Sequence, residues 1–576
     1  MARPRAGSGK ASPVVLFYWF LFASLVPNAV LSVTEHLSLM QSATNMLLPG
    51  GCYWLAMSLA RNPGKPVLWM LPITFLCAFE TVLLDLYGRS VIAVDMWLNL
   101  VTTNATEVGE LLFNLIPILC LVAVLYLIPL IMACISLVRK WRVSEGFQIA
   151  QRKCASLVLA AGIITFILSF FAGSRPFRPL NDIFPINAVT NCVIALHRDY
   201  ESSHYKSTSR DYRHYSVSTL PDSVPTLTIV VIGETSRATN WQLSGYERLT
   251  TPRLAARDSS LVYFPRTLTE SNTTHKSVPM LLTALDASSF GDSINYVTGV
   301  ISAFKEAGYA THFHSAQQPN GSYIDFIGEE ADVHEFLISA KDADHMHGGR
   351  DKMLIERLRK ALRSGNRHDL VVLHTYGSHF NYGDRYPAAM AQFRPDQPLE
   401  AEPENRANLI NAYDNSILRT DSILDALIGV AEESGRAATL IYTSDHGEDI
   451  YDDHRKLFLH ASPVPSYWQL HVPMLVWVSD EMRALRPELM QTLRHNAGKE
   501  VSSSRSFYHT ILDLGGVITK NFNSSAAISS PDYSWKEWQY LNDHNESVSL
   551  EGADIDPEDF EMLRNAGFKT AASSTR

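Results

Sequence analysis

Apolar residues are concentrated in the first third of this 576-residue chain, and that uneven distribution constrains the fold more than any other feature. Each of five long apolar stretches approaches or exceeds the ~20 residues that a helix needs to cross a bilayer. They are Val14–Val33, Ala43–Ala60, Val67–Leu86, Leu111–Val138 and Ala155–Ala172. We therefore predict an N-terminal all-α transmembrane domain of five helices over residues 1–173. The second stretch is the least regular, because Pro49, Gly50 and Gly51 interrupt it.

Lys and Arg residues around these stretches predict the orientation of the helices. They cluster in residues 3–10, 61–65 and 139–153, three segments that fall on one side of a five-helix domain. Basic loops stay in the cytoplasm, so the part that follows the fifth stretch is predicted to be extracytoplasmic. The first stretch could instead be a signal peptide, but it is long and four further apolar stretches follow it.

From about residue 224 the pattern changes to short β-branched runs that alternate with helical stretches. The predicted strands are Leu227–Ile232, Tyr309–His314, Leu370–Leu373, Leu440–Thr443 and Met474–Val478. The predicted helices include Ile294–Ala307, Lys352–Leu362 and Asn408–Ala431. This alternation predicts a C-terminal α/β domain over residues 224–520, with a mainly parallel sheet covered by helices.

Two polar segments flank the predicted α/β domain. Residues 174–223 form a connector along the membrane surface, and its proline-rich start cannot be regular helix. Residues 521–576 form an irregular tail with a short helix near Pro557–Asn565. No cysteine follows Cys192, so the exported part has no disulfide framework and depends on its core and any bound metal. The net charge of -10 argues against nucleic acid as a partner.

Polar clusters follow several of the predicted strands, at the edge where open α/β sheets build their sites. They contain Glu234, His379, Asp445, His446 and, on a loop before the last strand, His460. One polar strand end is usually structural, but carboxylates and imidazoles gathered at one edge are side chains that bind zinc. The sequence therefore predicts a metal site at this edge of the sheet.

The segment Asn272–Pro279 supplies a candidate nucleophile. Pro279, followed by three apolar residues, is typical of the first turn of a helix. A hydroxyl just before that turn would present a phosphoryl adduct to free backbone N–H groups and to the positive end of the helix dipole. The alternative is a Thr or Ser that only caps the helix, which is the commoner role of these residues.

Together these segments resemble the bacterial lipid-linked phosphoethanolamine transferases, a family of the alkaline phosphatase and sulfatase superfamily. The resemblance covers nearly the whole chain, including the five spans and the loop Thr103–Glu110 between the third and fourth of them. Its motifs are Gly-Glu-Thr-Ser-Arg at 233–237, Ser-Gly-Tyr at 244–246, Thr-x-x-Ser-Val-Pro at 274–279, Ala-Tyr-Asp-Asn at 412–415 and Ser-Asp-His-Gly-Glu at 444–448.

The resemblance implies which residues carry the chemistry. It makes Thr274 the nucleophile, with Thr273 as the next candidate. It makes Glu234, Asp445 and His446 zinc ligands together with the Thr274 oxygen. His379 and His460 are then ligands of a second metal or contacts to the phosphoryl group. Two further histidines, His454 and His471, are rivals of His460.

Substrate-binding residues are implied less directly. Gln317 and Gln318 lie where some family members place a lysine near the phosphoryl group, although a plain polar loop is an equal alternative. Asn104 or Glu110 is implied to receive the ammonium end of the donor headgroup, against the alternative of a solvated linker. Many family members flank the nucleophile with a disulfide, whereas this chain has Glu270 and Met280 there. That departure points to a disulfide-poor branch.

The implied activity is zinc-dependent transfer of phosphoethanolamine through a covalent phosphothreonine-type intermediate. The donor is phosphatidylethanolamine, and the acceptor is lipid A, lipopolysaccharide core or a periplasmic glucan. The implied location is the bacterial inner membrane, a lipid bilayer, with the catalytic domain in the periplasm. Alternatives are a phosphoglycerol transferase, a sulfatase or a non-catalytic membrane sensor. A sulfatase needs Arg two residues after the proline, where this chain has Leu281.

Overall fold

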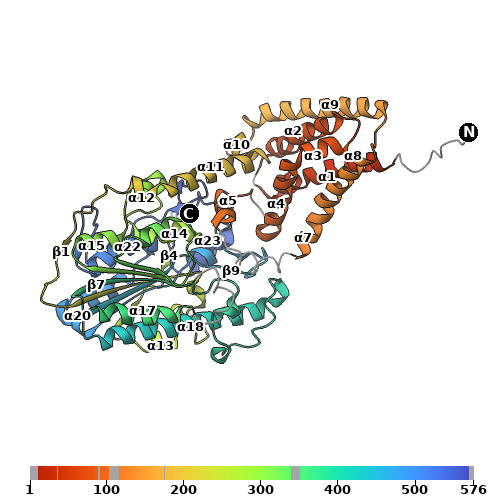
Figure 1. Ribbon diagram of the computed structural model, residues 1–576. Coiled ribbons are helices and arrows are strands. Elements are labelled where there is room, and N and C mark those ends of the chain that lie inside the picture. The colour runs from red at the N-terminus through yellow and green to blue at the C-terminus, as the bar shows by residue number, and fades with distance from the viewer. Residues whose placement is uncertain are drawn as a thin grey trace, which may run out of the picture. The chain divides into compact units, whose positions relative to one another are not determined.

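A computed structural model describes residues 11–35, 37–88, 91–102, 116–173, 176–338 and 350–569 of the chain. They form two compact units (Figure 1): one comprises the described residues of 1–98 and 111–197, and the other those of 99–110 and 198–576. The first unit is helical, and the second is an α/β unit built on one large sheet. Helix α11 (Ile186–Ser203) contributes residues to both units.

The N-terminal part of the chain is helical, and its helices occupy most of the five apolar stretches. They are α1 (Ala11–Thr34), α2 (Leu39–Ser58), α3 (Gly64–Trp69), α4 (Leu71–Tyr87), α5 (Val94–Thr102), α7 (Ile116–Val122), the π-helical turn η2 (Ala123–Leu127), α8 (Ile128–Val138) and α9 (Glu145–Ser169). Three helical segments of the described residues are long and apolar enough to cross a membrane: Ser12–Thr34, Ile116–Val138 and Glu145–Ser169. The count of five spanning helices therefore stays a prediction.

The stretch that contains Pro49 nevertheless forms the continuous helix α2, which packs closely on α9. A Cβ added at Gly51 would lie 2.7 Å from the Leu159 Cα, and one at Gly162 would lie 2.7 Å from the Leu48 nitrogen. Small residues allow two helix backbones to approach this closely. The glycines that interrupt the apolar stretch thus serve the packing of the two helices.

The polar connector contains more helix than its composition indicates. Three helices lie there: α10 (Pro179–Asp182), α11 (Ile186–Ser203) and α12 (Tyr205–Thr208). In α11 the exposed apolar residues Ile186, Val189, Val193 and Leu196 recur every three or four positions, which is a helical spacing. The connector was thus predicted without this helix because its overall polarity hides the periodicity.

The second unit is built on a seven-stranded sheet. Its strands, in spatial order, are β3 (Leu261–Tyr263), β11 (Met474–Val478), β8 (Ala437–Ser444), β2 (Thr226–Gly233), β7 (His368–His374), β5 (Ala310–Ser315) and β6 (Val333–Phe336). The five strands from β8 to β6 are parallel, as predicted. Strand β11 runs antiparallel to both of its neighbours, so the sheet is mixed. No long crossover helix lies between β8 and β11, and antiparallel neighbours need none.

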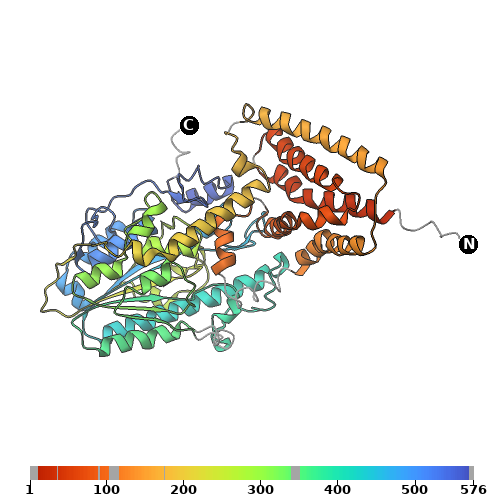
Figure 2. The same ribbon diagram turned by 45° about the horizontal axis from the view of Figure 1, so that its top comes forward.

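Helices cover both faces of this sheet (Figure 1). One face holds α14 (Thr274–Leu282), α15 (Val300–Glu306), α16 (Tyr323–Gly328) and α22 (Ser503–Leu514). The other holds α13 (Pro252–Ala255), α17 (Lys352–Arg363) and α18 (Arg406–Glu433). Figures 1 and 2 show α17 and α18 side by side. In β2, Val230 and Ile232 enter the first core while Ile229 and Val231 enter the second, which explains its unbroken apolar run.

Smaller elements complete the second unit. The short helices are α19 (Tyr467–Leu470), α20 (Asp480–Leu485), α21 (Leu489–Asn496) and α23 (Pro557–Asn565). The short strands are β1 (Val217–Ser218), β4 (Thr267–Leu268), β9 (Asp449–Ile450), β10 (Phe458–Leu459), β12 (Val501–Ser502), β13 (Val517–Ile518), β14 (Tyr540–Leu541) and β15 (Ser547–Val548). Helix α23 confirms the predicted helix in the tail. The stretch predicted as the helix Ile294–Ala307 is broken ahead of Gly299, where a Cβ would lie 2.6 Å from Ile327.

Candidate active site and metal centre

The central strands of the sheet bring the predicted site residues together. Because β8, β2 and β7 are parallel neighbours, their carboxyl ends meet at one edge. Glu234 follows β2, and Asp445 with His446 follows β8. His379 lies in the loop after β7. The convergence that the strand pattern predicted is therefore present.

Three of these side chains form a compact buried group. Potential ligand atoms of Glu234, Asp445 and His446 all lie within 4.8 Å of one another. His446 Nε2 is 3.2 Å from Asp445 Oδ2 and 3.5 Å from Glu234 Oε1. The hydroxyl of Thr274, at the start of α14, lies 3.1 Å from His446 Nε2 and 3.3 Å from Glu234 Oε1. We call these four residues the primary group.

The backbone fixes the ligand atoms of the primary group. His446 Nδ1–H donates to the Gly447 carbonyl at 2.9 Å, which leaves the lone pair on Nε2 facing the group. Asp445 Oδ1 accepts from the backbone N–H groups of Thr235 and His446. Asp445 Oδ2 is buried without a hydrogen-bond partner among the described residues. Lone pairs that face one another in a buried place fit a bound cation.

The charges of the primary group lead to the same conclusion. Glu234 and Asp445 are fully buried, and no Lys or Arg of the described residues forms an ion pair with either. Burial and the charge of Glu234 raise the pKa of Asp445 well above its ordinary value. Burial also acts to raise the pKa of Glu234, but His446, His379 and His374 outweigh it and lower that pKa. A divalent cation would balance two buried carboxylates.

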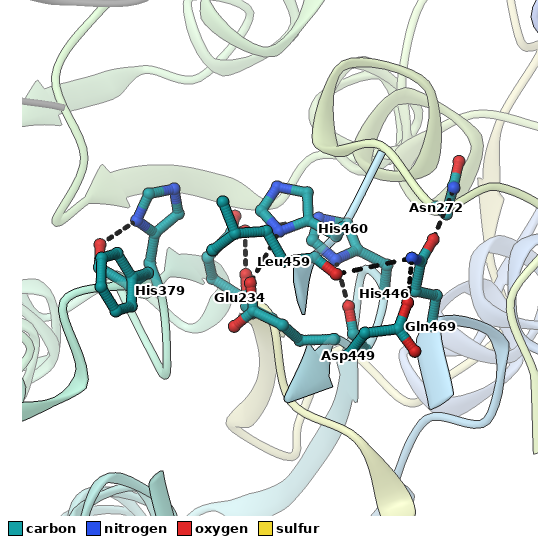
Figure 3. Close-up of polar contacts among 12 residues, drawn as sticks. Glu234, Asn272, His379, His446, Asp449, Leu459, His460 and Gln469 are labelled. Carbon is teal, nitrogen blue, oxygen red and sulfur yellow. Dashed lines mark hydrogen bonds and ion pairs between the residues drawn. The ribbon is translucent and has the colours of Figure 1, made fainter. Parts of the chain in front are cut away.

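A second group shares Glu234 with the first. Potential ligand atoms of Glu234, His379 and His460 also lie within 4.8 Å of one another, and we call these three residues the secondary group. The His460 ring lies 4.1 Å from the His446 ring and 5.9 Å from the His379 ring, between centroids. Figure 3 shows His379 to the left of Glu234, and His446 and His460 to its right. Both histidines of the secondary group are half-buried.

The two rivals of His460 lie elsewhere. His454 is largely exposed and pairs with Glu558 at 3.3 Å. His471 is buried, and its Nε2–H donates to the Pro265 carbonyl at 2.8 Å. Of the three candidates, His460 is the one that the structure brings to the metal-ligand groups.

The predicted substrate-binding residues have different surroundings. Gln317 Nε2 donates to Glu234 Oε2 at 2.9 Å and lies 3.1 Å from His374 Nε2. Gln318 is half-buried and forms no hydrogen bond within the part of the chain that the structure describes. Asn104 and Glu110 lie outside the described residues.

The start of α14 differs from its prediction. The helix begins at Thr274, so Pro279 lies inside it rather than in its first turn. The first turn closes earlier, because the N–H groups of Lys276 and Ser277 donate to the Thr273 carbonyl. Thr273 forms no side-chain cap, and its hydroxyl lies 3.2 Å from that of Ser271 instead. The hydroxyl that faces the primary group is that of Thr274.

Several residues that support the site were not assigned a role from the sequence. Glu448 is buried, and its carboxylate binds His460 Nδ1 at 3.1 Å and accepts from the Tyr382 hydroxyl at 2.8 Å. Thr235 has a φ of 57° and donates its hydroxyl to Glu234 Oε1 at 2.7 Å. Both lie within two residues of a candidate metal ligand, and that proximity in sequence is the signal that could have identified them. Burial raises the pKa of Glu448 well above its ordinary value.

The remaining motifs form a scaffold behind the primary group. The Tyr413 hydroxyl donates to the Thr235 carbonyl at 2.7 Å and accepts from the Arg237 N–H at 2.9 Å, which holds the turn that carries Glu234. Arg237 is itself buried and pairs with Asp452 at 2.6 Å. Asp414 accepts from Asn240 and Tyr246 in the same layer.

Comparisons with known proteins agree with this geometry. The phosphoethanolamine transferase EptA of Escherichia coli K12 is 30% identical over 308 residues, which cover 52% of this chain and 55% of that protein. The chain thus spans about half the length of that relative. The integral membrane lipooligosaccharide phosphoethanolamine transferase A of Neisseria meningitidis shares the fold, with a TM-score of 0.70, 21% identity and coverage of 91% of this chain and 99% of that one.

A metal-bound structure is also similar in fold. It is the periplasmic domain of EptC from Escherichia coli in complex with Zn, with a TM-score of 0.53, 21% identity and coverage of 59% of this chain and 96% of that one. The resemblance to phosphoethanolamine transferases is therefore confirmed. The model of the sulfatase family matches residues 226–517, just over half of the chain. The chain belongs to the sulfatase family.

Proposed function

We propose that this chain is a zinc-dependent membrane enzyme that transfers phosphoethanolamine from phosphatidylethanolamine to an envelope glycolipid or glycan. The observation that carries the proposal is the Thr274 hydroxyl, which lies within 3.4 Å of both Glu234 carboxylate oxygens and of His446 Nε2. A hydroxyl placed among metal-ligand atoms is the arrangement of an activated nucleophile. The names of the similar transferases support the chemical class.

Glu234, Asp445, His446 and the Thr274 oxygen are the ligands that would hold zinc. When bound, zinc lowers the pKa of the Thr274 hydroxyl and offsets charge on the phosphoryl oxygens. The backbone bonds of Asp445 and His446 keep their ligand atoms oriented before the ion arrives. His379 and His460 either hold a second metal or contact the phosphoryl group.

The reaction would proceed by two displacements at phosphorus. First, Thr274 Oγ1 forms a bond to phosphorus, the bond to the diacylglycerol oxygen breaks, and the hydroxyl proton ends on that leaving oxygen. The positive end of the α14 dipole, at Thr274, would favour the negative charge of the resulting phosphothreonine. Then the acceptor oxygen forms a bond to phosphorus, the bond between phosphorus and Thr274 Oγ1 breaks, and a proton released by the acceptor or taken from water ends on Oγ1. Such transfer depends on in-line placement and on compensation of charge.

The N-terminal helices fit a lipid donor. We propose that residues 1–173 form a five-helix membrane domain, that residues 174–223 connect it to the catalytic domain, and that residues 224–520 act in the periplasm of a bacterial inner membrane, followed by the tail 521–576. The Neisseria relative acts, by its name, on lipooligosaccharide, which supports a glycolipid acceptor. Gln317, Gln318, Asn104 and Glu110 remain the proposed substrate-binding residues.

The other reactions of this fold fit less well. A sulfatase nucleophile would occupy the position of Ser277, but its hydroxyl donates to the Ser271 carbonyl at 3.0 Å. Leu281 also stands where a sulfatase needs Arg. A non-catalytic sensor has no need of metal ligands, and all four residues of the primary group are present.

Mass spectrometry of the purified chain tests the proposal. After incubation with phosphatidylethanolamine, a peptide that contains Thr274 should carry a phosphoethanolamine adduct. Thr274→Ala should lose the adduct, whereas Thr273→Ala should keep it. An adduct that persists in Thr274→Ala, or that moves to another peptide of the wild type, would contradict the assignment.

A further inference from the structure

The C-terminal tail is attached to the loop that carries the nucleophile. Residues 269–276, a loop with the first turn of α14, are called the nucleophile loop, and residues 538–542 of the tail form the segment that we call the clamp. Trp538 Nε1–H donates to the Thr269 carbonyl at 3.1 Å, and the Leu541 N–H donates to the Glu270 carbonyl at 2.8 Å. Lys276 Nζ donates to the Asn542 carbonyl at 2.9 Å. The clamp lies outside the residues 226–517 that match the sulfatase family.

Side chains of the clamp and the loop meet at Asn272. The Tyr540 hydroxyl donates to Asn272 Oδ1 at 2.8 Å. Asn272 Nδ2 donates to the Ser462 carbonyl at 2.8 Å and to Gln469 Oε1 at 2.6 Å. All polar atoms of this amide are thus bonded in a buried place, and its orientation is fixed, since only Oδ1 can accept and only Nδ2 can donate.

Asn272 also connects the nucleophile loop to the loops that carry metal-ligand residues. Its carbonyl accepts from the N–H of Ala461, the residue that follows His460. Gln469 Nε2 donates to Asp449 Oδ2 at 2.6 Å, and the Gln469 carbonyl accepts from the Gly447 N–H, next to His446. Figure 3 shows Asn272 and Gln469 beside His446 and His460. Asn272 therefore joins three segments that must keep fixed distances for catalysis.

No disulfide can hold these segments, because no cysteine follows Cys192. Hydrogen bonds and apolar packing are what remain to hold them. The Tyr540 ring stacks with Trp538, with ring centroids 6.0 Å apart, and belongs to a buried apolar cluster with Leu268 and Leu470, which anchors the clamp independently of its hydroxyl. The hydroxyl orients the Asn272 side chain, because it donates to Oδ1 of that residue. Asn272 lies two residues before Thr274.

We propose that Tyr540 and Asn272 are positioning residues, through which the C-terminal clamp keeps the Thr274 hydroxyl in line with the metal-ligand group. The proposal rests on the proposed function of Thr274 as a nucleophile. Neither residue touches the reacting atoms; each acts through the nucleophile loop. A misplacement of about 1 Å can cost about 100-fold in rate, so a small shift of this loop has a measurable effect.

The test compares two conservative substitutions in the full-length protein. Tyr540→Phe removes the hydroxyl that bonds to Asn272 and keeps the packed ring. Tyr533→Phe is the matched control, because Tyr533 is also a buried tail residue, and its hydroxyl donates to the Glu500 carbonyl at 2.7 Å, away from the nucleophile loop. Transfer kinetics, zinc content and hydrogen exchange of the peptide 269–276 are measured for both variants.

We expect Tyr540→Phe to lower kcat by about 10-fold or more, with KM for the donor and zinc content unchanged. Amide exchange in residues 269–276 should become faster in this variant, while Tyr533→Phe should change neither kcat nor that exchange. Equal losses in both variants, or an unchanged kcat in Tyr540→Phe, would overturn the proposal. An inactive wild type would refute the proposed function instead, and the exchange comparison alone would then decide whether the clamp holds the loop.

Discussion

The primary and secondary groups share Glu234 but differ in how far their other members are closed to solvent. Asp445 and His446 are fully buried, and each is oriented by bonds to the backbone. His379 and His460 are half-buried. His379 Nδ1 lies 2.7 Å from the Phe380 carbonyl oxygen, and His460 Nδ1 bonds to the carboxylate of Glu448, whose other oxygen binds Tyr382.

This difference suits the two groups around Glu234 to two different functions. Ligands that are closed to solvent are suited to an ion that stays in place. Partly exposed imidazoles are suited to a group that arrives and leaves, such as the phosphoryl group or a second metal. If the difference is functional, substitutions in the primary group should remove both metal and activity, whereas those in the secondary group should separate the two.

The largest effect is expected for Asp445→Asn. The amide has one oxygen fewer than the carboxylate to bind a metal, so zinc content per mole should fall. Activity should fall by more than about 100-fold, because the loss of a residue that only hydrogen-bonds to a metal ligand already lowers affinity or activity by about 10- to 100-fold. Elemental analysis with transfer assays checks this. Asp425→Asn, at an ion pair about three helical turns beyond Tyr413 in α18, is the control and should retain both zinc and activity. Full zinc content in Asp445→Asn would contradict the role of the primary group.

A smaller effect is expected for His460→Ala. Activity should fall by about 100-fold, as for a misplaced reacting group, while the zinc of the primary group should remain. His454→Ala, which removes an exposed histidine of the neighbouring loop, should leave activity unchanged. Loss of all zinc in His460→Ala would show that the two groups form a single metal site, which would contradict the division into two groups.

Glu448→Gln should lower activity by about 10-fold through the orientation of the His460 ring, as for other partners of ligand histidines. Tyr382→Phe is the control, since it removes the other hydrogen bond of Glu448 and leaves the contact with His460 in place. Equal losses in the two variants would mean that Glu448 serves only the stability of the core.

The smallest effect is expected for Gln317→Ala, which removes a hydrogen bond to Glu234. The loss of one hydrogen bond corresponds to a decrease of about threefold to tenfold in kcat. Gln318→Ala provides the comparison, because Gln318 has no such bond among the described residues. A larger loss in Gln318→Ala than in Gln317→Ala would favour substrate binding over support of Glu234.

The sequence predicted the sheet and the primary group for a physical reason. Continuous β-branched runs identify strands buried on both faces, and parallel strands place Glu234, Asp445 and His446 at one edge. Local signals were less reliable. Pro279 is compatible with a first turn, yet hydrogen bonds to the Thr273 carbonyl start α14 five residues earlier. The contact between Asn272 and Tyr540 spans 268 residues and belongs to no local pattern, so only the fold reveals it.

The most direct test of the account is the position of zinc in crystals of the wild-type protein, measured by anomalous scattering at the zinc absorption edge. The account predicts a peak about 2.0–2.2 Å from oxygens of Glu234, Asp445 and Thr274 and from His446 Nε2. A peak bound by His379 and His460 alone, or a zinc-loaded active protein without a peak beside Thr274, would contradict it.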